Sequence, residues 1–266
     1  MIHFVGAGPG APDLITLRGA RLLAEAGLVV YAGSLVNPQL LEGTPPGCVV
    51  MDSARMTLED VVEALQSAHD RGIDAVRLHT GDPALYGAIR EQMDQLDARG
   101  IPYDVTPGVS SLFGAAAALG AELTLPGVTQ SLIVTRAEGR TPVPEAERLV
   151  GLAAHGCTLA LFLSAGLLDR VEADLAAAGL EPDTPAAIVY RATWPDQQVH
   201  RCTASTLART ARQAGITRTA LVLVGRFLGE GFDRSLLYDP AFSHGYRTAH
   251  AAPPCRKGPA EAARDE

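Results

Sequence analysis

The sequence predicts an α/β protein of two domains, the first built on a mainly parallel sheet and the second on a mixed sheet. Three observations lead to this prediction. The 266 residues are enough for one large domain or two of ordinary size. Short apolar or β-branched runs alternate with segments of helical pattern along most of the chain. The alternation breaks at residues 120–127, which include Leu-Pro-Gly, and this predicts a domain boundary near residue 120.

The first set of elements is a regular succession of strands and helices. Thr57, followed three residues later by Asp60, predicts a capping box at the start of one helix. Alternation of this kind is typical of a parallel sheet with helices on both faces. We expect strands at 3–7, 28–31, 48–51, 75–79 and 103–105, and helices at 14–26, 57–71, 86–99 and 109–119.

The second set contains a pair of strands with no helix between them, at 186–190 and 198–201. Such strands pair as a hairpin, which makes the second sheet mixed. We expect its other strands at 131–135, 159–163 and 220–224, and its helices at 167–179 and 205–215. The predicted domains are therefore 1–120 and 121–242. Residues 243–266, rich in proline, alanine and charge, are expected to form a polar tail.

The composition excludes several functions. The chain has 22 basic and 30 acidic residues and a formal charge of −8, which argues against a nucleic-acid partner bound without sequence specificity. Lys257 is the only lysine, so a Schiff-base lysine in the core and a phosphate-loop lysine are both excluded. The arginine bias fits a GC-rich genome, recognition of carboxylates or phosphates by guanidinium groups, or both.

The cysteines and the apolar runs indicate the compartment. Cys48, Cys157, Cys202 and Cys255 are scattered, with no C-x-x-C pair and no histidine at zinc-ligand spacing. We therefore expect reduced thiols, no metal site and a cytoplasmic protein. We expect no signal peptide, because the first predicted strand begins at residue 3. The longest apolar stretches, such as the one that starts at Thr158, fall short of the ~18 residues of a spanning helix, so no membrane contact is expected.

A glycine-rich loop at residues 6–11, Gly-Ala-Gly-Pro-Gly-Ala, follows the first predicted strand and is similar at first sight to a dinucleotide-binding loop. Pro9 removes a backbone N–H, and Pro12 delays the following helix, so the phosphate site is poorly formed. The acidic residue that should end the second strand is missing, since residues 31–33 are Tyr-Ala-Gly. A tight turn and a close approach of the backbone to a ligand both remain open for this loop.

Three motifs in order resemble the tetrapyrrole methylases: GAGPGAPDLITLRGARLLAEAGLVVY at 6–31, GDPALYG at 81–87 and PGVSS at 107–111. The blocks YAGSLVNPQLL at 31–41 and TRAEGRTPVPEAE at 135–147 resemble the branch of that family that methylates precorrin-4 at C11 in cobalamin biosynthesis. The similarity runs from about residue 2 to about residue 240.

This resemblance implies a methyltransferase of two α/β domains with a trough between them, working as a homodimer. It implies S-adenosylmethionine as methyl donor, S-adenosylhomocysteine as product and the tetrapyrrole precorrin-4 as substrate. Whether the substrate carries cobalt stays open.

The resemblance also assigns residues at strand ends to the cofactor. On residue type alone, Asp82 and Pro83 predict a helix start, and Ser110 and Ser111 predict the cap of another helix. Ordinary core is an equal alternative for Phe162, Leu163 and Ala220. The residues implied to contact S-adenosylmethionine are Pro9, Thr80, Gly81, Asp82, Leu85, Ser110, Ser111, Phe162, Leu163, Ala192, Thr219 and Ala220.

The branch-specific blocks supply the expected substrate contacts. Arg136, Glu138 and Arg140 lie in one loop, which is either a solvated charged loop or a site for the carboxylates of the tetrapyrrole. Ser34 and Asn37 are expected on the first domain's rim of the trough. Because the substrate is rich in carboxylates and the chain is acidic, positive charge must be concentrated in the trough by arginines, helix N-termini and backbone amides.

Methyl transfer from a sulfonium uses an activated donor, so positioning and exclusion of water should dominate catalysis. Asp82 and Tyr86 are the catalytic candidates, because both are expected near the cofactor. The aspartate that uroporphyrinogen-methylating relatives carry after the second strand is absent here. Other hypotheses are methylation of a protein or ribosomal RNA on the same fold, a dinucleotide-dependent oxidoreductase, and a tetrapyrrole-binding module without catalysis.

Overall fold

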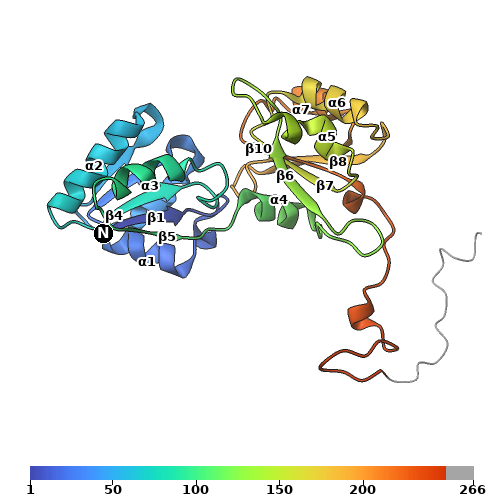
Figure 1. The fold of residues 1–266 in the computed structure, drawn as a ribbon, viewed down its shortest axis with the longest axis horizontal. Coiled ribbons are helices and arrows are strands. Elements are labelled where there is room, and N and C mark those ends of the chain that lie inside the picture. The colour runs from blue at the N-terminus through green and yellow to red at the C-terminus, as the bar shows by residue number, and fades with distance from the viewer. Residues whose placement is uncertain (250–266) are drawn as a thin grey trace, which may run out of the picture.

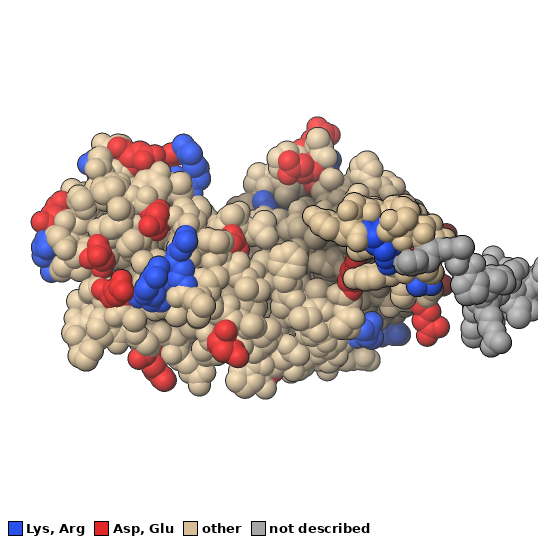
Figure 2. Space-filling model, turned by 90° about the horizontal axis from the view of Figure 1, so that it is seen from below, with Lys and Arg blue, Asp and Glu red and all other residues tan. Residues whose placement is uncertain are grey.

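The computed structural model describes residues 1–249, apart from the side chain of Ser34. It has two five-stranded sheets, each covered by helices on both faces (Figure 1). Seen from below, the molecule has two lobes, with acidic and basic side chains interspersed over both (Figure 2). The predicted class, two α/β domains with one parallel and one mixed sheet, is confirmed. Most of the predicted tail, residues 250–266, lies outside the described residues.

The first sheet is parallel throughout, with strand order β3-β2-β4-β1-β5. Its register pairs Gly6 with His79, so the segments that follow β1 and β4 leave the sheet side by side. The strands are β1 Ile2–Gly6, β2 Leu28–Tyr31, β3 Val49–Asp52, β4 Ala75–His79 and β5 Tyr103–Thr106.

Three helices cover this sheet. Helix α1 (Leu17–Glu25) packs on one face, and α2 (Leu58–Asp70) and α3 (Ile89–Asp97) pack on the other (Figure 1). The predicted capping box is present at the start of α2. The amide of Asp60 donates to Thr57 Oγ1 at 3.2 Å, and the amide of Thr57 donates to the Asp60 carboxylate at 2.9 Å.

The predicted helix at 86–99 begins later than expected, and Asp82 and Pro83 do not start it. Tyr86 and Ala88 have φ angles of 57° and 50°, in the left-handed region that a right-handed helix cannot include. Residues 83–86 therefore form a turn, and α3 begins only at Ile89. The prediction of Asp82 as a helix cap was wrong, and the turn leaves this segment facing the second domain.

The second sheet has strand order β6-β7-β10-β8-β9. Strands β6 and β7 are parallel and the remaining pairs are antiparallel, so the predicted hairpin of β8 and β9 is confirmed. The strands are β6 Leu132–Arg136, β7 Thr158–Phe162, β8 Pro185–Tyr190, β9 Gln198–Thr203 and β10 Ala220–Val224.

Helices α5 (Leu149–Ala153), α6 (Leu168–Ala177) and α7 (Leu207–Gln213) cover one face of the second sheet, and α4 (Ser111–Leu119) covers the other (Figure 1). Helix α4 precedes residue 120, yet it packs on the apolar face of β8 and β10. The boundary at residue 120 remains a prediction, and we propose from this packing that the second unit starts at α4.

Short 3-10 helices complete the connections, at Pro12–Leu14, Gly33–Leu35, Pro38–Gly43, Ser53–Arg55, Glu145–Glu147, Arg226–Leu228 and Leu236–Tyr238. Cys48, Cys157 and Cys202 carry free thiols, and Cys255 lies outside the described residues. Over residues 1–249, no helix has the length and apolar character needed to cross a membrane.

Candidate functional site

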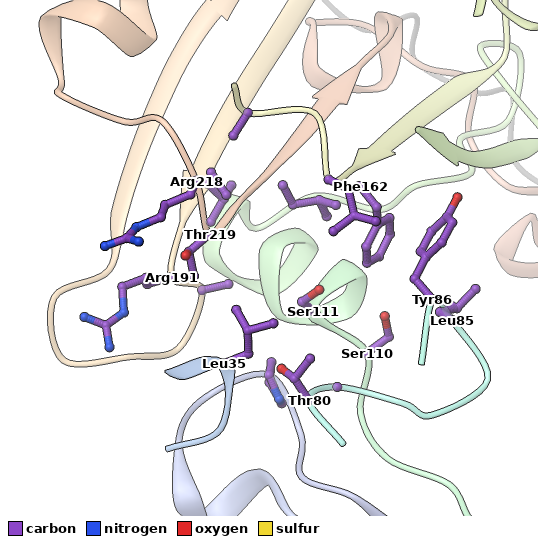
Figure 3. Close-up of a pocket in the computed structure, with 18 of the residues that line it drawn as sticks. Leu35, Thr80, Leu85, Tyr86, Ser110, Ser111, Phe162, Arg191, Arg218 and Thr219 are labelled. Carbon is purple, nitrogen blue, oxygen red and sulfur yellow. The ribbon is translucent and has the colours of Figure 1, made fainter. Parts of the chain in front are cut away.

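A cavity of about 770 Å³ lies where the loops at the ends of the two sheets meet (Figure 3). Its walls come from the segments after β1, β2, β4, β6, β7 and β8, the start of α4 and the segment before β10 together with the start of that strand. It brings together all the residues that the sequence assigned to the cofactor, although these are far apart in the chain. They are Pro9, Thr80, Gly81, Asp82, Leu85, Ser110, Ser111, Phe162, Leu163, Ala192, Thr219 and Ala220.

Asp82 joins two of the loops that line this cavity. Its Oδ1 accepts the amide of Ala84 at 2.8 Å, and its Oδ2 accepts the amide of Gly108 at 2.9 Å. Both carboxylate oxygens therefore hold backbone. A Cβ on Gly108 would lie 2.1 Å from the carbonyl oxygen of Gly81, which is closer than any real contact, so only glycine allows these loops to meet.

The glycine-rich loop after β1 packs against the same junction. Gly8 and Gly81 exchange backbone hydrogen bonds of 3.2 and 2.8 Å, forming an isolated bridge. The structure shows a tight approach of two backbone segments at this loop, and the close approach to a ligand stays a prediction. Pro9 is the residue of this loop that lines the cavity.

The N-terminus of α4 points toward the cavity. Ser110 is 5% exposed, and its hydroxyl accepts the amide of Leu112 at 3.3 Å, which confirms the predicted cap. Ser110 and Ser111 both line the cavity. The wall therefore contains the positive end of the helix dipole and two serine hydroxyls that can form further hydrogen bonds.

Backbone strain is concentrated around the cavity. Tyr86, Leu163, Arg191 and Thr219 have φ angles of 57°, 52°, 45° and 55°, and all four line it. Left-handed conformations cost about 1–3 kcal/mol in non-glycine residues and cluster at ligand sites. Their concentration here is independent support for a binding site.

An aromatic pair connects the two domains at one side of the cavity. The rings of Tyr86 and Phe162 lie 5.4 Å apart between centroids, tilted by 40° (Figure 3). Burial raises the pKa of Tyr86, Arg136 lowers it to a smaller extent, and Glu147 adds a small increase. The phenol is therefore protonated at neutral pH and can donate a hydrogen bond on the side of the loop that carries Arg136.

Positive charge is concentrated in the cavity, as the acidic composition required. Arg140, Arg191 and Arg218 line it, together with Asp82. Arg191 pairs with Asp196 at 2.5 Å. Within residues 1–249, Arg140 and Arg218 have no ion-pair partner, which leaves both guanidinium groups available to an anion.

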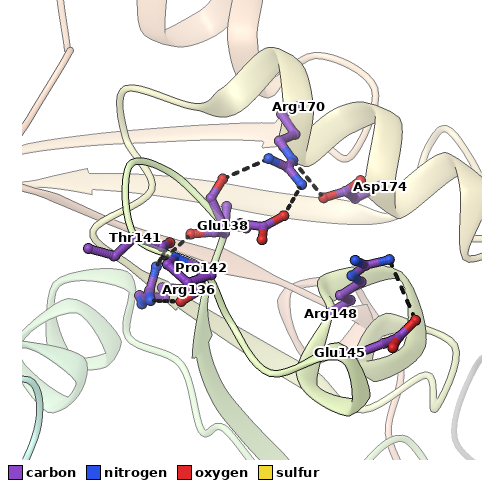
Figure 4. A network of polar contacts seen from close by, with 9 residues as sticks. Arg136, Glu138, Thr141, Pro142, Glu145, Arg148, Arg170 and Asp174 are labelled. Carbon is purple, nitrogen blue, oxygen red and sulfur yellow. Dashed lines mark hydrogen bonds and ion pairs between the residues drawn. The ribbon is translucent and has the colours of Figure 1, made fainter.

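Arg136 and Glu138, the other two predicted substrate contacts of the 135–147 block, hold the loop itself in place (Figure 4). Arg136 donates to the carbonyl oxygens of Thr141 at 3.1 Å and of Pro142 at 2.7 Å. Glu138 accepts from Arg170 at 2.6 Å, and this bond lowers the pKa of the Glu138 carboxyl. Neither residue lines the cavity, and only Arg140 of the three predicted substrate contacts in this loop does so.

Asn37 also has its amide occupied by the protein. It is 6% exposed, its Nδ2 donates to the carbonyl oxygen of Gly10 at 2.9 Å, and its Oδ1 accepts the amide of Gln39 at 3.1 Å. It therefore fixes the glycine-rich loop from behind and does not line the cavity. The side chain of Ser34, the other predicted contact in this block, lies outside the described residues.

The sequence did not assign several residues of the wall to the site, and those with charged or aromatic side chains are Arg191, Trp194 and Arg218. Arg191 and Trp194 lie in the turn of the β8–β9 hairpin, and the guanidinium carbon of Arg191 lies 4.0 Å from the centroid of the indole ring. The turn itself was identified through Ala192, and the signal that could have added these two side chains is a lone tryptophan close to an arginine between two predicted strands.

The family model described as tetrapyrrole (corrin/porphyrin) methylases matches residues 1–208. The chain belongs to this family. A cobalt-precorrin-4 C(11)-methyltransferase of Methanocaldococcus jannaschii is 47% identical over 250 residues, which cover 94% of this chain and 96% of the relative. A precorrin-4 C(11)-methyltransferase of Pseudomonas aeruginosa is 47% identical over 247 residues, covering 92% and 98%.

Solved structures agree with this membership. The X-ray structure of a cobalamin biosynthetic enzyme, cobalt precorrin-4 methyltransferase, superimposes with a TM-score of 0.84 at 48% identity and covers 86% of this chain and 96% of that one. A Thermus thermophilus uroporphyrin-III C-methyl transferase complexed with S-adenyl homocysteine has a TM-score of 0.71 at 28% identity, covering 85% and 92%.

Proposed function

We propose that this protein is an S-adenosylmethionine-dependent C-methyltransferase that methylates precorrin-4 at C11, giving precorrin-5, in cobalamin biosynthesis. The observation that carries the proposal is the cavity between the domains, which gathers every residue assigned to the cofactor by the family resemblance. Relatives with this activity match more than nine-tenths of the chain at about 47% identity.

The residues of the cavity fit S-adenosylmethionine. A volume of about 770 Å³ is in the range of small-molecule sites, roughly 300–1,000 Å³. Apolar side chains such as Leu35, Leu163 and Phe162 would pack against the adenosine. The hydroxyls of Thr80, Ser111 and Thr219 supply donors and acceptors for its polar groups. We propose the residues named above as the cofactor contacts.

When bound, this cofactor supplies a methyl group already activated by a sulfonium. In the reaction the C–S bond breaks with both electrons remaining on sulfur, a C–C bond forms at C11, and the ring system loses a proton. The chain's contribution is to hold the two reactants in line and exclude water, and such orientation can supply ~7–11 kcal/mol. Asp82 fixes two loops of the site, and Tyr86 offers a protonated hydroxyl beside them.

We propose that Arg140 and Arg218 hold carboxylates of the substrate. Both line the cavity, both are exposed, and within residues 1–249 neither has an acidic partner. A planar guanidinium binds a carboxylate through two parallel hydrogen bonds.

A cobalt-bearing substrate is the second candidate, and one observation keeps it. A cobalt-precorrin-4 methyltransferase of Priestia megaterium is 48% identical to this chain, while a precorrin-4 methyltransferase of Mycobacterium tuberculosis is 46% identical. Overall identity therefore does not separate the two substrates.

The experiment incubates the protein with S-adenosylmethionine and, in parallel, with precorrin-4 or cobalt-precorrin-4, followed by mass analysis and carbon NMR. We expect a gain of one methyl at C11 with one of the substrates. A methyl at another carbon would contradict the C11 assignment and leave the methyltransferase activity in place. No gain with either substrate would contradict the proposed function.

We also propose that the chain forms the homodimer implied by the resemblance. Residues 230–249 extend from the second domain and expose large apolar side chains, among them Phe232, Tyr238 and Tyr246 at 66%, 70% and 101% exposure (Figure 1). Surface of this kind is typical of protein contacts. Light scattering coupled to size-exclusion chromatography should give twice the mass of one chain. The mass of a single chain would contradict this proposal.

A further inference from the structure

The two domains are hydrogen-bonded to each other at one place. The amide of Ala11 donates to Thr193 Oγ1 at 2.9 Å, and the indole Nε1 of Trp194 donates to the carbonyl oxygen of Pro9 at 3.2 Å. Over the described chain, these are the two hydrogen bonds that join residues 1–107 to residues 111–249. The glycine-rich loop of the first domain is therefore bound to the β8–β9 turn of the second.

The indole of Trp194 is fixed on two sides. The Arg191 guanidinium lies over its face at 4.0 Å and is itself held by Asp196. Gly10 lies against the pyrrole edge, where a Cβ would be only 2.1 Å from Cδ1 and 2.2 Å from Nε1. Any side chain at position 10 would displace the ring. Gly10 therefore serves this contact with the tryptophan.

This contact forms a wall of the cavity. Pro9, Arg191, Ala192 and Trp194 all line it, with Pro9 on one domain and the other three on the opposite one. The separation of the two walls at this end is set by the Trp194–Pro9 hydrogen bond and by the indole seated on Gly10. Relative motion is the default for two domains of one chain, so a fixed contact at this end restricts how the domains are arranged.

We propose that Trp194 is a positioning residue: its indole, seated on Gly10, holds the domains in the arrangement that forms the cofactor cavity. It acts on methyl transfer through the placement of Pro9 and Ala192. The rate effect rests on the proposed function, but the domain arrangement does not.

A double-mutant cycle on affinity for S-adenosylhomocysteine, measured by calorimetry, tests this contact. Gly10→Ala should weaken binding at least ten-fold, because its methyl displaces the indole. Trp194→Ala should weaken binding by a similar factor. The double variant should lose less affinity than the product of the two single losses, because the methyl then has room and only the backbone strain at the Gly10 φ of 158° remains. Gly43→Ala is the control, because a Cβ at Gly43 meets nothing within 4 Å. Losses that multiply in the double variant would overturn the proposal.

A conservative variant separates positioning from folding. Trp194→Phe keeps an aromatic ring on Gly10 and loses the N–H, so we expect affinity roughly two- to twelve-fold below wild type, the value of one hydrogen bond, in a protein that is still fully folded at the assay temperature. The cofactor KM should rise with the dissociation constant. Unchanged affinity in Trp194→Phe, or a loss of affinity only in protein that is partly unfolded at the assay temperature, would contradict a positioning role.

Small-angle X-ray scattering of the ligand-free protein provides a readout that does not depend on the proposed function. Gly10→Ala and Trp194→Ala should both have a larger radius of gyration than wild type and Gly43→Ala. Unchanged radii would overturn the proposal even if the enzyme is active. If wild type fails to bind S-adenosylhomocysteine while the radii change as expected, the proposed function fails and the positioning role of Trp194 stands.

Discussion

Asp82 is predicted to stabilise the site by joining two loops, and its removal should be costly in a specific way. Its two oxygens accept amides of Ala84 and Gly108 at 2.8 and 2.9 Å. A hydrogen bond to a charged group contributes about 1.5–3 kcal/mol to stability. Because the Asp82 carboxylate is partly exposed, the lower value applies to each of its two bonds, and Asp82→Ala should lower the free energy of unfolding by about 3 kcal/mol. Asp82→Asn keeps one acceptor and should cost about half as much.

Urea unfolding gives these free energies, and Asp52→Ala is the matched control. Asp52 accepts the amide of Ala54 at 2.8 Å in the same local geometry, but it is exposed and does not line the cavity. Its loss should cost about 1 kcal/mol. If the free energy of unfolding lost in Asp82→Ala is within about 0.5 kcal/mol of the loss in that control, Asp82 does not hold the two loops together.

Affinity and rate then distinguish this joint from catalysis by Asp82. If Asp82 holds the loops, affinity for S-adenosylhomocysteine should fall about ten-fold in Asp82→Ala and less in Asp82→Asn, in the order of the stability losses. A catalytic base would give the opposite pattern, with unchanged affinity and a fall in kcat of roughly 10²-fold or more in Asp82→Asn.

Three further predictions concern other parts of the site. Gly108→Ala should lower the free energy of unfolding by about 3 kcal/mol or more, because its Cβ would meet a backbone carbonyl at 2.1 Å. The control Gly151→Ala has open space in a helix and should be neutral or stabilising. Equal urea midpoints of the two variants would contradict the close approach. Burial, with a smaller effect of a nearby arginine, lowers the pKa of His79 to about 3, so the unfolded chain binds the extra proton below pH ~6.5 and stability falls as pH falls. Between pH 7 and pH 5 the free energy of unfolding of the wild type should fall by about 2 kcal/mol more than that of His79→Leu, and an exposed-site control, His155→Leu, should behave as the wild type. Equal losses in all three proteins would show that His79 is not the cause. Tyr86→Phe keeps the ring stacking, so it should bind S-adenosylhomocysteine within two-fold of wild type while kcat falls roughly 10²-fold, and a kcat within two-fold of wild type would remove Tyr86 from the catalytic candidates.

The fold could be predicted from the sequence because its signals are local. Strands at 28–31, 75–79 and 220–224 were predicted with the observed limits, since each is a short apolar run bounded by turns or helices. The helix start at Asp82 was predicted wrongly, because residue type alone does not reveal that Tyr86 and Ala88 are held in left-handed conformations. Tyr86 contacts Phe162 of the second domain, and no local window of sequence contains that contact.

The motifs predicted many of the residues that line the cavity. They did not predict how individual side chains are oriented, because this also depends on contacts that are distant in sequence. Residues at strand ends were gathered as expected, because parallel strands deliver the segments that follow them to one edge. Arg136 and Glu138 share a loop with Arg140, but the sequence does not show which guanidinium turns inward and which binds carbonyl groups of its own loop. The role of Trp194 depends on a contact across 185 residues of sequence, and only the folded arrangement reveals it.

The most direct test of the central claim is a crystal structure of the protein with S-adenosylhomocysteine. The account predicts one molecule in the cavity between the domains, in contact with Pro9 and Thr80 on one side and with Ala192 and Thr219 on the other. Density for the ligand at any other place, or a saturated protein whose cavity stays empty, would contradict it.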